Sequence, residues 1–161
     1  MKKYELTEET VTVYGKTLYR IRAVRDFGSV KTGEFGGYIE KEENLSHFGD
    51  AWVYGNAKVS GDAKVSGNAK VSGDAKVSGD AEVFNTRHFF VQGPIGSRDG
   101  YVTFYRTKDD TIGVRCGCFS GSLQKFVDRV EETHGGSRYE KEYKLAAELA
   151  KVCIRLEGES R

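Results

Sequence analysis

Residues 49–84 read GDAWVY GNAKVS GDAKVS GNAKVS GDAKVS GDAEVF, a run of hexapeptides of the form Gly-(Asp/Asn)-Ala-x-Val-x. One residue separates each Ala from its Val, so both side chains lie on the same face of a short strand. The Gly-Asp or Gly-Asn pair then supplies a corner, because these residue types tolerate positive φ. The repeat therefore predicts three short strands per 18-residue coil, and two regular coils.

Stacked coils place residues 18 apart next to one another. This spacing predicts three pairs among the residues that lie between Ala and Val and point outward: Trp52 with Lys70, Lys58 with Lys76, and Lys64 with Glu82. The resulting lysine ladder is most simply a solvated face of the protein. A face that binds an anion or a partner is the alternative.

The residues before the repeat follow a different pattern. Residues 10–25, TVTVYGKTLYRIRAVR, alternate apolar and polar residues around Tyr-Gly-Lys, which predicts a β-hairpin. In 26–48, Ile39 and Leu45 keep the hexapeptide spacing, but eight residues separate Leu45 from Val53, so the register slips by two. We interpret 26–48 as an irregular first coil that caps the open end of the repeat.

After residue 84 the periodicity becomes that of a small α+β domain. Alternation and turn signals predict three strands, at 88–93, 101–107 and 111–119. Apolar spacing predicts a helix over 122–134 with Ser122 as its N-cap, and Ser137-x-x-Glu140 has the form of a capping box that begins a second helix. This order is typical of an antiparallel sheet with both helices on one face.

These patterns predict a mainly β protein in three parts: a hairpin and cap at 1–48, the repeat at 49–84, and the α+β domain at 85–161. Over all of 49–84 the chain resembles the hexapeptide-repeat, left-handed parallel β-helix family. The resemblance implies a short left-handed β-helix of about two regular coils. Many members of that family are homotrimers and many are acyltransferases, but a fold by itself implies no activity.

A second resemblance covers most of the chain. The string TLYRIRAVRDFG…GEFGGYIEKEENLSHFGDAWVYGNA resembles proteins of bacteriophage and prophage genomes, which are often labelled transferases on the strength of their repeats alone. This resemblance implies no established activity.

Composition excludes several classes of protein. The chain has 20 glycines but one proline, and glycine does not recur at every third position, which excludes collagen. A hydrophobic share of 38% and a net charge of +1 argue against disorder and against a general nucleic-acid binder. The absence of an 18-residue apolar run and of an apolar leader, with an odd number of cysteines, predicts a cytoplasmic protein without a membrane span, in a bacterial host if phage-encoded.

The segment GPIGSRDG at 93–100 joins two predicted strands and contains the only proline. Its open backbone N–H groups, a hydroxyl and a planar guanidinium suit a phosphate or a carboxylate. It is not a Walker motif, because no Gly-Lys-Ser/Thr follows. A plain hairpin loop is the alternative. The candidate anion site, including more distant groups that could join the loop in space, comprises Gly96, Ser97, Arg98, Arg106, Arg115 and His134.

We predict no catalytic residue, metal site or cofactor. Cys116-Gly-Cys118 lacks the spacing of zinc or thiol redox motifs, and both cysteines are interpreted as core residues of one strand, as is Cys153 in the last helix. A Cys118–His134 nucleophile pair is the alternative. His47 is the histidine nearest the repeat that an acyltransferase could use, although a polar residue where the coils begin is the simpler interpretation.

The expected function follows from the small core. Two coils lined by Ala and Val bury little apolar surface, so copies are expected to associate, and the resemblance to the hexapeptide-repeat family implies a homotrimer. The loop chemistry of 93–100, together with the resemblance to phage proteins, favours a non-enzymatic, phage-type binding protein that sequesters a nucleotide-type immune signal or occludes a host defence protein. An acyltransferase that uses acyl-CoA and a structural or assembly protein are the alternatives.

Overall fold

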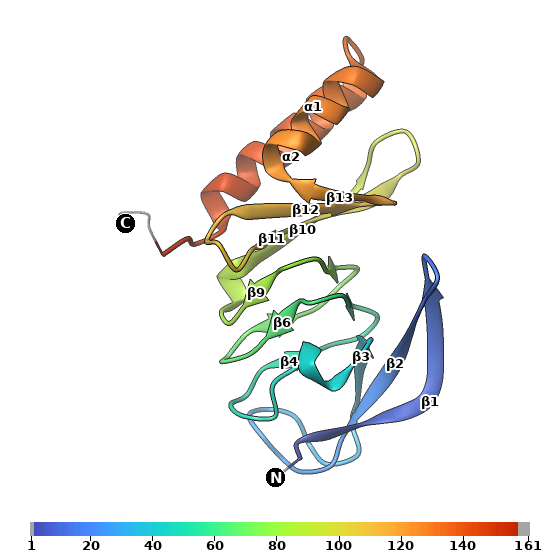
Figure 1. The fold of residues 1–161 in the computed structure, drawn as a ribbon, viewed down its shortest axis with the longest axis vertical. Helices are drawn as coiled ribbons and strands as arrows, with labels where there is room; N and C mark the ends of the chain where they lie inside the picture. Colours follow the sequence, from blue (N-terminus) through green and yellow to red (C-terminus); the bar gives the residue numbers. More distant parts are fainter. Residues whose placement is uncertain (1, 158–161) are drawn as a thin grey trace.

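The fold was obtained as a computed structural model that describes residues 2–157. The chain is mainly β, and its two helices lie at the C-terminal end. Figure 1 shows a stack of layers, in which the N-terminal hairpin and the repeat lie below a sheet and the two helices lie above that sheet. No helix among the described residues combines the length and the apolar character that crossing a bilayer requires.

The repeat forms six two-residue strands in three parallel pairs. The strands are β4 (Trp52–Val53), β5 (Lys58–Val59), β6 (Lys64–Val65), β7 (Lys70–Val71), β8 (Lys76–Val77) and β9 (Glu82–Val83). Their partners are Trp52 with Lys70, Lys58 with Lys76, and Lys64 with Glu82. The predicted stacking of residues 18 apart is therefore confirmed.

Small inward side chains and glycine corners allow this stacking. The Ala and Val of every repeat unit are buried, with 1% exposure at most. The corner glycines all adopt positive φ, which an L-residue with a side chain rarely adopts. At Gly49 a Cβ atom would also lie 2.8 Å from the carbonyl oxygen of Gly67 in the next coil. All the corners therefore favour glycine for its conformation, and Gly49 is also required by the close approach of the coils.

The N-terminal segment extends one face of the repeat. Strands β1 (Tyr4–Val13) and β2 (Lys16–Ala23) form the predicted hairpin, which turns at Tyr14 and Gly15 with positive φ. Strand β3 (Phe35–Ile39) pairs antiparallel with β2 and parallel with β5, which gives one sheet of order β1-β2-β3-β5-β8.

The irregular first coil is also confirmed. Ile39 pairs with Val59 and Leu45 with Val65, an offset two residues longer than that of the regular coils. A short 3-10 helix, η1 (Glu42–Asn44), lies between these two contacts. The two extra residues lie after η1, between Leu45 and Val53, where the offset returns to that of the regular coils, and the inward side chains still enter the shared core.

Trp52 differs from the expectation for its position in the repeat. It stands between Ala and Val and was expected to point into solvent, but it is only 1% exposed. The rings of Tyr4 and Phe27 pack edge-on against it, at centroid distances of 6.2 and 5.2 Å. Gly36 leaves room for it, because a Cβ there would lie 2.8 Å from the indole. The N-terminal segment thus covers this face of the repeat.

The C-terminal sheet has four strands rather than the three predicted. They are β10 (Phe89–Ile95), β11 (Gly100–Arg106), β12 (Ile112–Cys116) and β13 (Phe119–Ser122), all antiparallel and in chain order. The predicted strand at 111–119 is interrupted because Gly117 adopts a φ of +56° and turns the chain into a hairpin. A second 3-10 helix, η2 (Thr86–His88), connects the repeat to this sheet.

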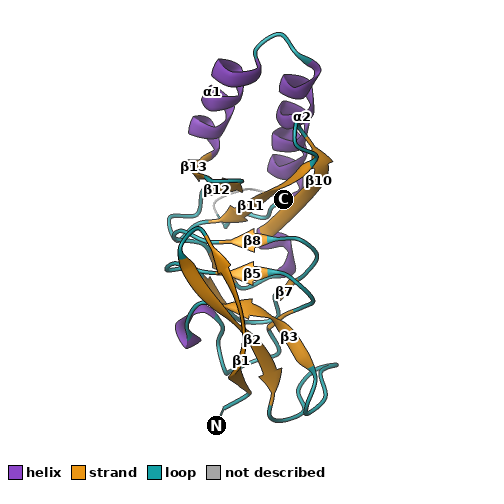
Figure 2. Ribbon diagram, turned by 90° about the vertical axis from the view of Figure 1, so that its right-hand side faces the viewer, coloured by secondary structure: helices purple, strands orange, loops and turns teal. Residues whose placement is uncertain are grey.

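This sheet separates the two cores of the molecule. Phe104 of β11 packs with the helices, whereas its neighbour Tyr105 belongs to the core of the repeat. On that second face, the Oγ1 of Thr103 accepts a hydrogen bond of 2.9 Å from the backbone N–H of Lys76. The sheet therefore closes the C-terminal end of the repeat, and Figure 2 shows it lying across the last coil beneath the helices.

Two helices cover the other face, as predicted: α1 (Leu123–His134) and α2 (Arg138–Cys153). The Oγ of Ser122 accepts from the N–H of Lys125, which confirms the N-cap. The capping box at α2 is wrong, because the Ser137 hydroxyl donates to the His134 carbonyl instead, and Glu140 accepts from Gly136 N–H. Because the connection between the helices is short, the side chains of Ser137 and Glu140 bond to the backbone of that connection and not to each other's backbone.

Candidate functional site

The loop between β10 and β11 is attached to helix α2. The backbone N–H of Gly96 donates to the Glu142 carboxylate at 2.7 Å. Gly96 has a φ of +80°, and a Cβ there would collide with the Tyr143 hydroxyl. The predicted anion cradle therefore binds a carboxylate of its own chain through this N–H.

The rest of the loop carries free polar groups. Ser97 and Arg98 are exposed, and Arg98 makes no ion pair with any of residues 2–157. Arg98 follows Gly96 by two residues in the loop that packs on Tyr143. Burial raises the pKa of Tyr143, and the positive charge of Arg98 partly opposes that rise. A second arginine, Arg138 on the first turn of α2, is 4.0 Å from Glu142 with its side chain 82% exposed. Two arginines thus lie at one end of the helical layer.

Aromatic rings complete this end of the molecule, which we call the loop–helix end (Ser97, Arg98, His134, Arg138, Tyr139 and Tyr143). The His134 ring lies 5.6 Å from that of Tyr143 and 5.9 Å from that of Tyr139. The three rings are half-buried. Guanidinium groups pair with phosphates, and aromatic rings stack on planar ligands. The arrangement can hold a molecule that has both.

Arg106 does not join the loop–helix end. It stands at the opposite end of β11 from Gly100, about 20 Å along the strand. Its guanidinium is buried, ion-pairs with Asp110 at 3.0 Å and donates to the Glu82 carbonyl at 3.1 Å. Arg106 thus joins the C-terminal sheet to the last coil, and its positive charge is used in contacts that stabilise the fold.

Arg115 also lies elsewhere. Its Nη1 donates to the Ser78 hydroxyl at 3.2 Å, and its guanidinium lies 5.1 Å from the ring of Tyr14 at the hairpin tip. It therefore faces the repeat, on the opposite side of the sheet from the helices. Of the six predicted residues, the structure brings together Gly96, Ser97, Arg98 and His134, and it places Arg106 and Arg115 at two other positions.

The cysteines differ from one another. Cys116 is half-buried against the helices, and its burial raises the thiol pKa, while it hydrogen-bonds with Tyr143. Cys118 was interpreted as a core residue of the same strand, but it is exposed, because Gly117 turns the chain between the two. Cys153 is half-buried. Among the described residues, no group of His, Cys, Asp and Glu side chains is arranged to hold a metal ion.

His47 lies in a buried polar cluster that the sequence did not reveal. Its Nδ1 accepts from the backbone N–H of Lys3 at 3.0 Å, so the ring proton is on Nε2, which lies 3.0 Å from the Glu42 carboxylate. The ring stacks on Tyr4 at 4.1 Å. Both ring nitrogens are therefore engaged in holding the N-terminus to the first coil.

Lys3 belongs to the same cluster and is fully buried. Its ammonium donates to the Ala51 carbonyl at 2.6 Å and lies 4.7 Å from the ring of Phe27. Burial, with a smaller effect of the nearby Arg25, lowers the pKa of Lys3 to about 8. Lys3 is buried by residues that lie far from it in the sequence. No local sequence pattern could therefore have revealed its burial.

Helix α2 exposes apolar side chains on its outer face. Leu145, Leu149 and Val152 are 70%, 46% and 66% exposed, and their spacing of four and three residues aligns them on one side of the helix. We call this row the α2 stripe. Exposed apolar rows of this kind mark interaction surfaces.

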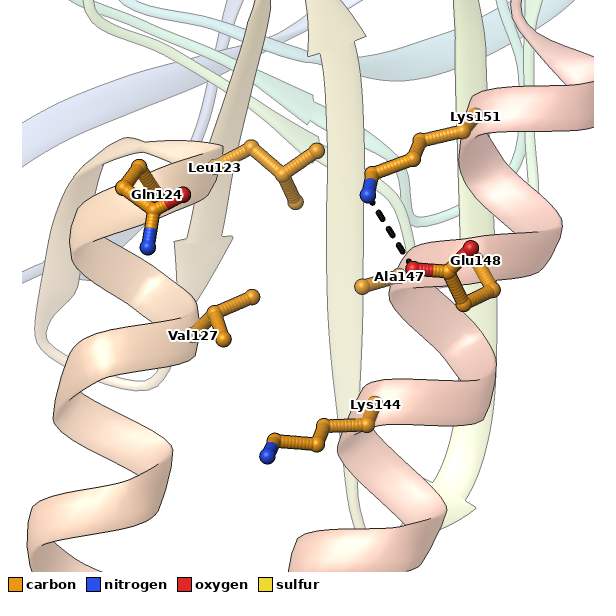
Figure 3. Close-up of a pocket in the computed structure, with 7 residues that line it drawn as sticks. All are labelled: Leu123, Gln124, Val127, Lys144, Ala147, Glu148 and Lys151. Atoms are coloured by element: carbon orange, nitrogen blue, oxygen red, sulfur yellow. Dashed lines mark hydrogen bonds and ion pairs between the residues drawn. The ribbon is translucent and has the colours of Figure 1, made fainter.

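A groove of about 560 Å³ separates α2 from α1. Figure 3 shows Leu123 and Val127 pointing across it toward Ala147, with Lys144 and Lys151 along the α2 side. Lys144 is paired with Glu131 at 2.6 Å, and Lys151 with Glu148 at 3.0 Å. The groove is therefore apolar at its floor and has compensated charges at its rim.

Comparison with known proteins adds no relative. No protein-family model matches the chain, and no curated protein matches it.

Proposed function

We propose that the protein is a non-enzymatic, homo-oligomeric binding protein that takes a phosphorylated small molecule at the loop–helix end. One observation carries the proposal: Arg98 lies in the loop that packs on Tyr143, whose ring is 5.6 Å from that of His134, and Arg138 lies 4.0 Å from Glu142, the carboxylate that also holds Gly96 N–H. A phosphate would pair with the guanidinium groups, and a planar base would stack on the rings.

The remainder of the molecule is the scaffold for this site. The pairing of residues 18 apart on three faces supports a left-handed parallel β-helix at 49–84, between a cap at 1–48 and the α+β domain at 85–161. Such a stem is rigid, because each coil is hydrogen-bonded to the next along its whole perimeter. It would hold the C-terminal domains of a trimer in fixed positions.

The hydrogen bonds of His47 favour binding over acyl transfer. A general base needs a free ring nitrogen within reach of the substrate. Lys3 and Glu42 occupy both nitrogens of His47. Using this histidine in catalysis would require the N-terminal segment to leave the repeat.

The resemblance to phage proteins suggests the biological setting. A small binder produced in a bacterial cytoplasm could sequester a nucleotide-type immune signal and so act in counter-defence. Sequestration needs affinity and abundance but no chemistry, which agrees with a scaffold that presents one exposed site per copy.

Equilibrium binding to a panel of linear and cyclic nucleotides tests the ligand class. We expect at least one nucleotide to bind with micromolar affinity, and Arg98→Ala and Arg138→Ala each to weaken it about tenfold, the loss of one charge-assisted contact. Arg22→Ala, an exposed arginine on the N-terminal hairpin, is the matched control. The proposal fails if no nucleotide binds below millimolar concentration, or if the three variants behave alike.

A second candidate function, the occlusion of a host defence protein, is favoured by the α2 stripe. Three large apolar side chains on one helix face are an interaction surface for a protein rather than for a nucleotide. Capture of a host protein by the wild type, lost in Leu149→Lys and retained in Arg98→Ala, would support this candidate over the first.

A further inference from the structure

Three cations lie in a row on one face of the repeat and on the sheet above it. Lys58 and Lys76 are direct partners on β5 and β8, so their backbones lie one ladder spacing apart, about 4.8 Å. Arg115 of β12 contacts Ser78, which follows β8 directly. We call Lys58, Lys76 and Arg115 the basic column.

Two contacts of Thr103 hold Arg115 beside Lys76. Thr103 of β11 is the register partner of Arg115. Thr103 also accepts, through its Oγ1, the hydrogen bond from the backbone N–H of Lys76. Because both contacts belong to the closure of the repeat by the sheet, the column is fixed by the fold and does not depend on flexible side chains alone.

The column is sheltered, unlike the rest of the lysine ladder. Lys58 and Lys76 are half-buried, whereas Lys64 and Lys70, at the same position of the repeat unit, are exposed. Strand β3 lies beside Lys58 and the C-terminal sheet lies beside Lys76, and in Figure 2 the N-terminal hairpin rises along the repeat toward that sheet. The ring of Tyr38 lies 5.7 Å from the Lys58 ammonium, and that of Tyr14 lies 5.1 Å from Arg115.

The positive charges in the column lack acidic partners. Among residues 2–157, none of the three cations makes an ion pair, whereas the neighbouring Arg20 is paired with Glu9 at 2.8 Å. Burial lowers the pKa of Lys58, and the charge of Lys76 lowers it further, against a weaker opposing effect of Asp74. Holding like charges together costs free energy that a bound anion would offset.

We propose that the basic column binds the phosphate chain of a polyphosphorylated small molecule. Two lysines one β-ladder spacing apart, with Arg115 of the adjoining sheet beside the second, match successive phosphate groups better than a single round anion. Lysines contribute point charges and Arg115 a planar fork of donors. This site shares no residue with the loop–helix end, so it goes beyond the function proposed above.

Calorimetric titration with inorganic tripolyphosphate at low ionic strength tests the column directly. We expect one molecule per chain, with a Kd that rises at least tenfold in Lys76→Gln and in Arg115→Gln. Lys64→Gln and Lys70→Gln remove the same charge from the same repeat position on other faces, and we expect them to change the Kd less than twofold. A nucleoside triphosphate should show the same dependence, because its phosphate chain is what the column recognises.

Thermal unfolding without ligand guards against a folding artefact. Since Lys76→Gln relieves repulsion with Lys58, we expect its midpoint to equal or exceed that of the wild type, so lost binding would not reflect lost structure. If Lys64→Gln and Lys76→Gln weaken tripolyphosphate binding equally, the binding depends only on the net charge of the protein, and the proposal is overturned. Loss of binding in Arg98→Ala alone would also overturn it, and would assign the anion to the loop–helix end instead.

Discussion

Gly96 illustrates how a single residue joins two elements. Its positive φ and its proximity to the Tyr143 hydroxyl leave no room for a side chain, while its N–H is held by Glu142. We expect Gly96→Ala to lower the free energy of unfolding by about 1–3 kcal/mol, from backbone strain and displaced packing. Urea unfolding measures the change. Gly100→Ala, where a Cβ meets nothing within 4 Å, is the control and should cost less than about 1 kcal/mol.

Lys3 makes stability depend on pH. Its pKa falls from 10.5 to about 8 on folding, so between these values the unfolded chain binds more protons than the native one. The contribution of Lys3 to stability therefore rises with pH from about 8, by up to about 1.4 kcal/mol per pH unit. Urea unfolding at pH 8 and 9 should show this rise in the wild type relative to Lys3→Met. Lys31→Met, an exposed lysine, should follow the wild type, and parallel behaviour of Lys3→Met would contradict the assignment.

Helix α2 has two apolar faces with different roles. Ala146, Ala147 and Ala150 are buried against the sheet and α1, whereas the α2 stripe faces outward. If the stripe joins copies of the chain, Leu149→Lys should shift the mass measured by light scattering toward the monomer. Thr133→Lys, on the exposed side of α1, should leave the mass unchanged. If the wild-type protein is monomeric at high concentration, the part of the proposed function that requires a homo-oligomer is wrong.

The sequence predicted elements best where one local period governs several residues. The repeat, the hairpin turn at Tyr14 and Gly15, and the Ser122 cap all follow from short-range spacing or backbone conformation, and all are confirmed. The strand predicted at 111–119 is confirmed only over Ile112–Cys116, because apolar alternation continues through Gly117 although the backbone turns there. The alternation of apolar and polar side chains is the same before and after Gly117. It therefore does not reveal that the backbone turns between the two strands.

At the scale of the whole molecule, stability depends on the junction between the repeat and the C-terminal sheet. Tyr105 is 2% exposed and packs into the core of the repeat, with its hydroxyl hydrogen-bonded to Ser78 and Ser120. We expect Tyr105→Ala to destabilise the protein by about 3–5 kcal/mol, since it opens a cavity at the end of the coils. Hydrogen exchange should speed up in the last coil and in β11 together.

Tyr101→Ala is the matched control for this junction, because Tyr101 lies on the same strand but is 44% exposed. It should cost less than about 1.5 kcal/mol and leave exchange in the last coil unchanged. Equal effects of the two substitutions would mean that the sheet does not close the repeat.

The candidate site was only partly predictable. Gly96, Ser97 and Arg98 are adjacent in sequence, and His134 joins them because α1 ends at the same side of the sheet. Arg106 and Arg115 were assigned from residue type alone, and their positions depend on which face of which strand they occupy. Arg138 was missed. The pairing of Lys58 with Lys76 was predicted, but its proximity to Arg115 was not, since that contact depends on how the sheet closes the repeat.

By itself, the sequence determined the six strands of the repeat, their 18-residue pairing, the slip in the first coil and the two C-terminal helices. Each follows from a local period that burial of small apolar side chains enforces. The tertiary structure alone decided that Trp52 is covered, that the second sheet closes the coils, and that Lys58 and Lys76 differ from Lys64 and Lys70. Identical repeat units acquire different environments because the segments that cover them come from elsewhere in the chain.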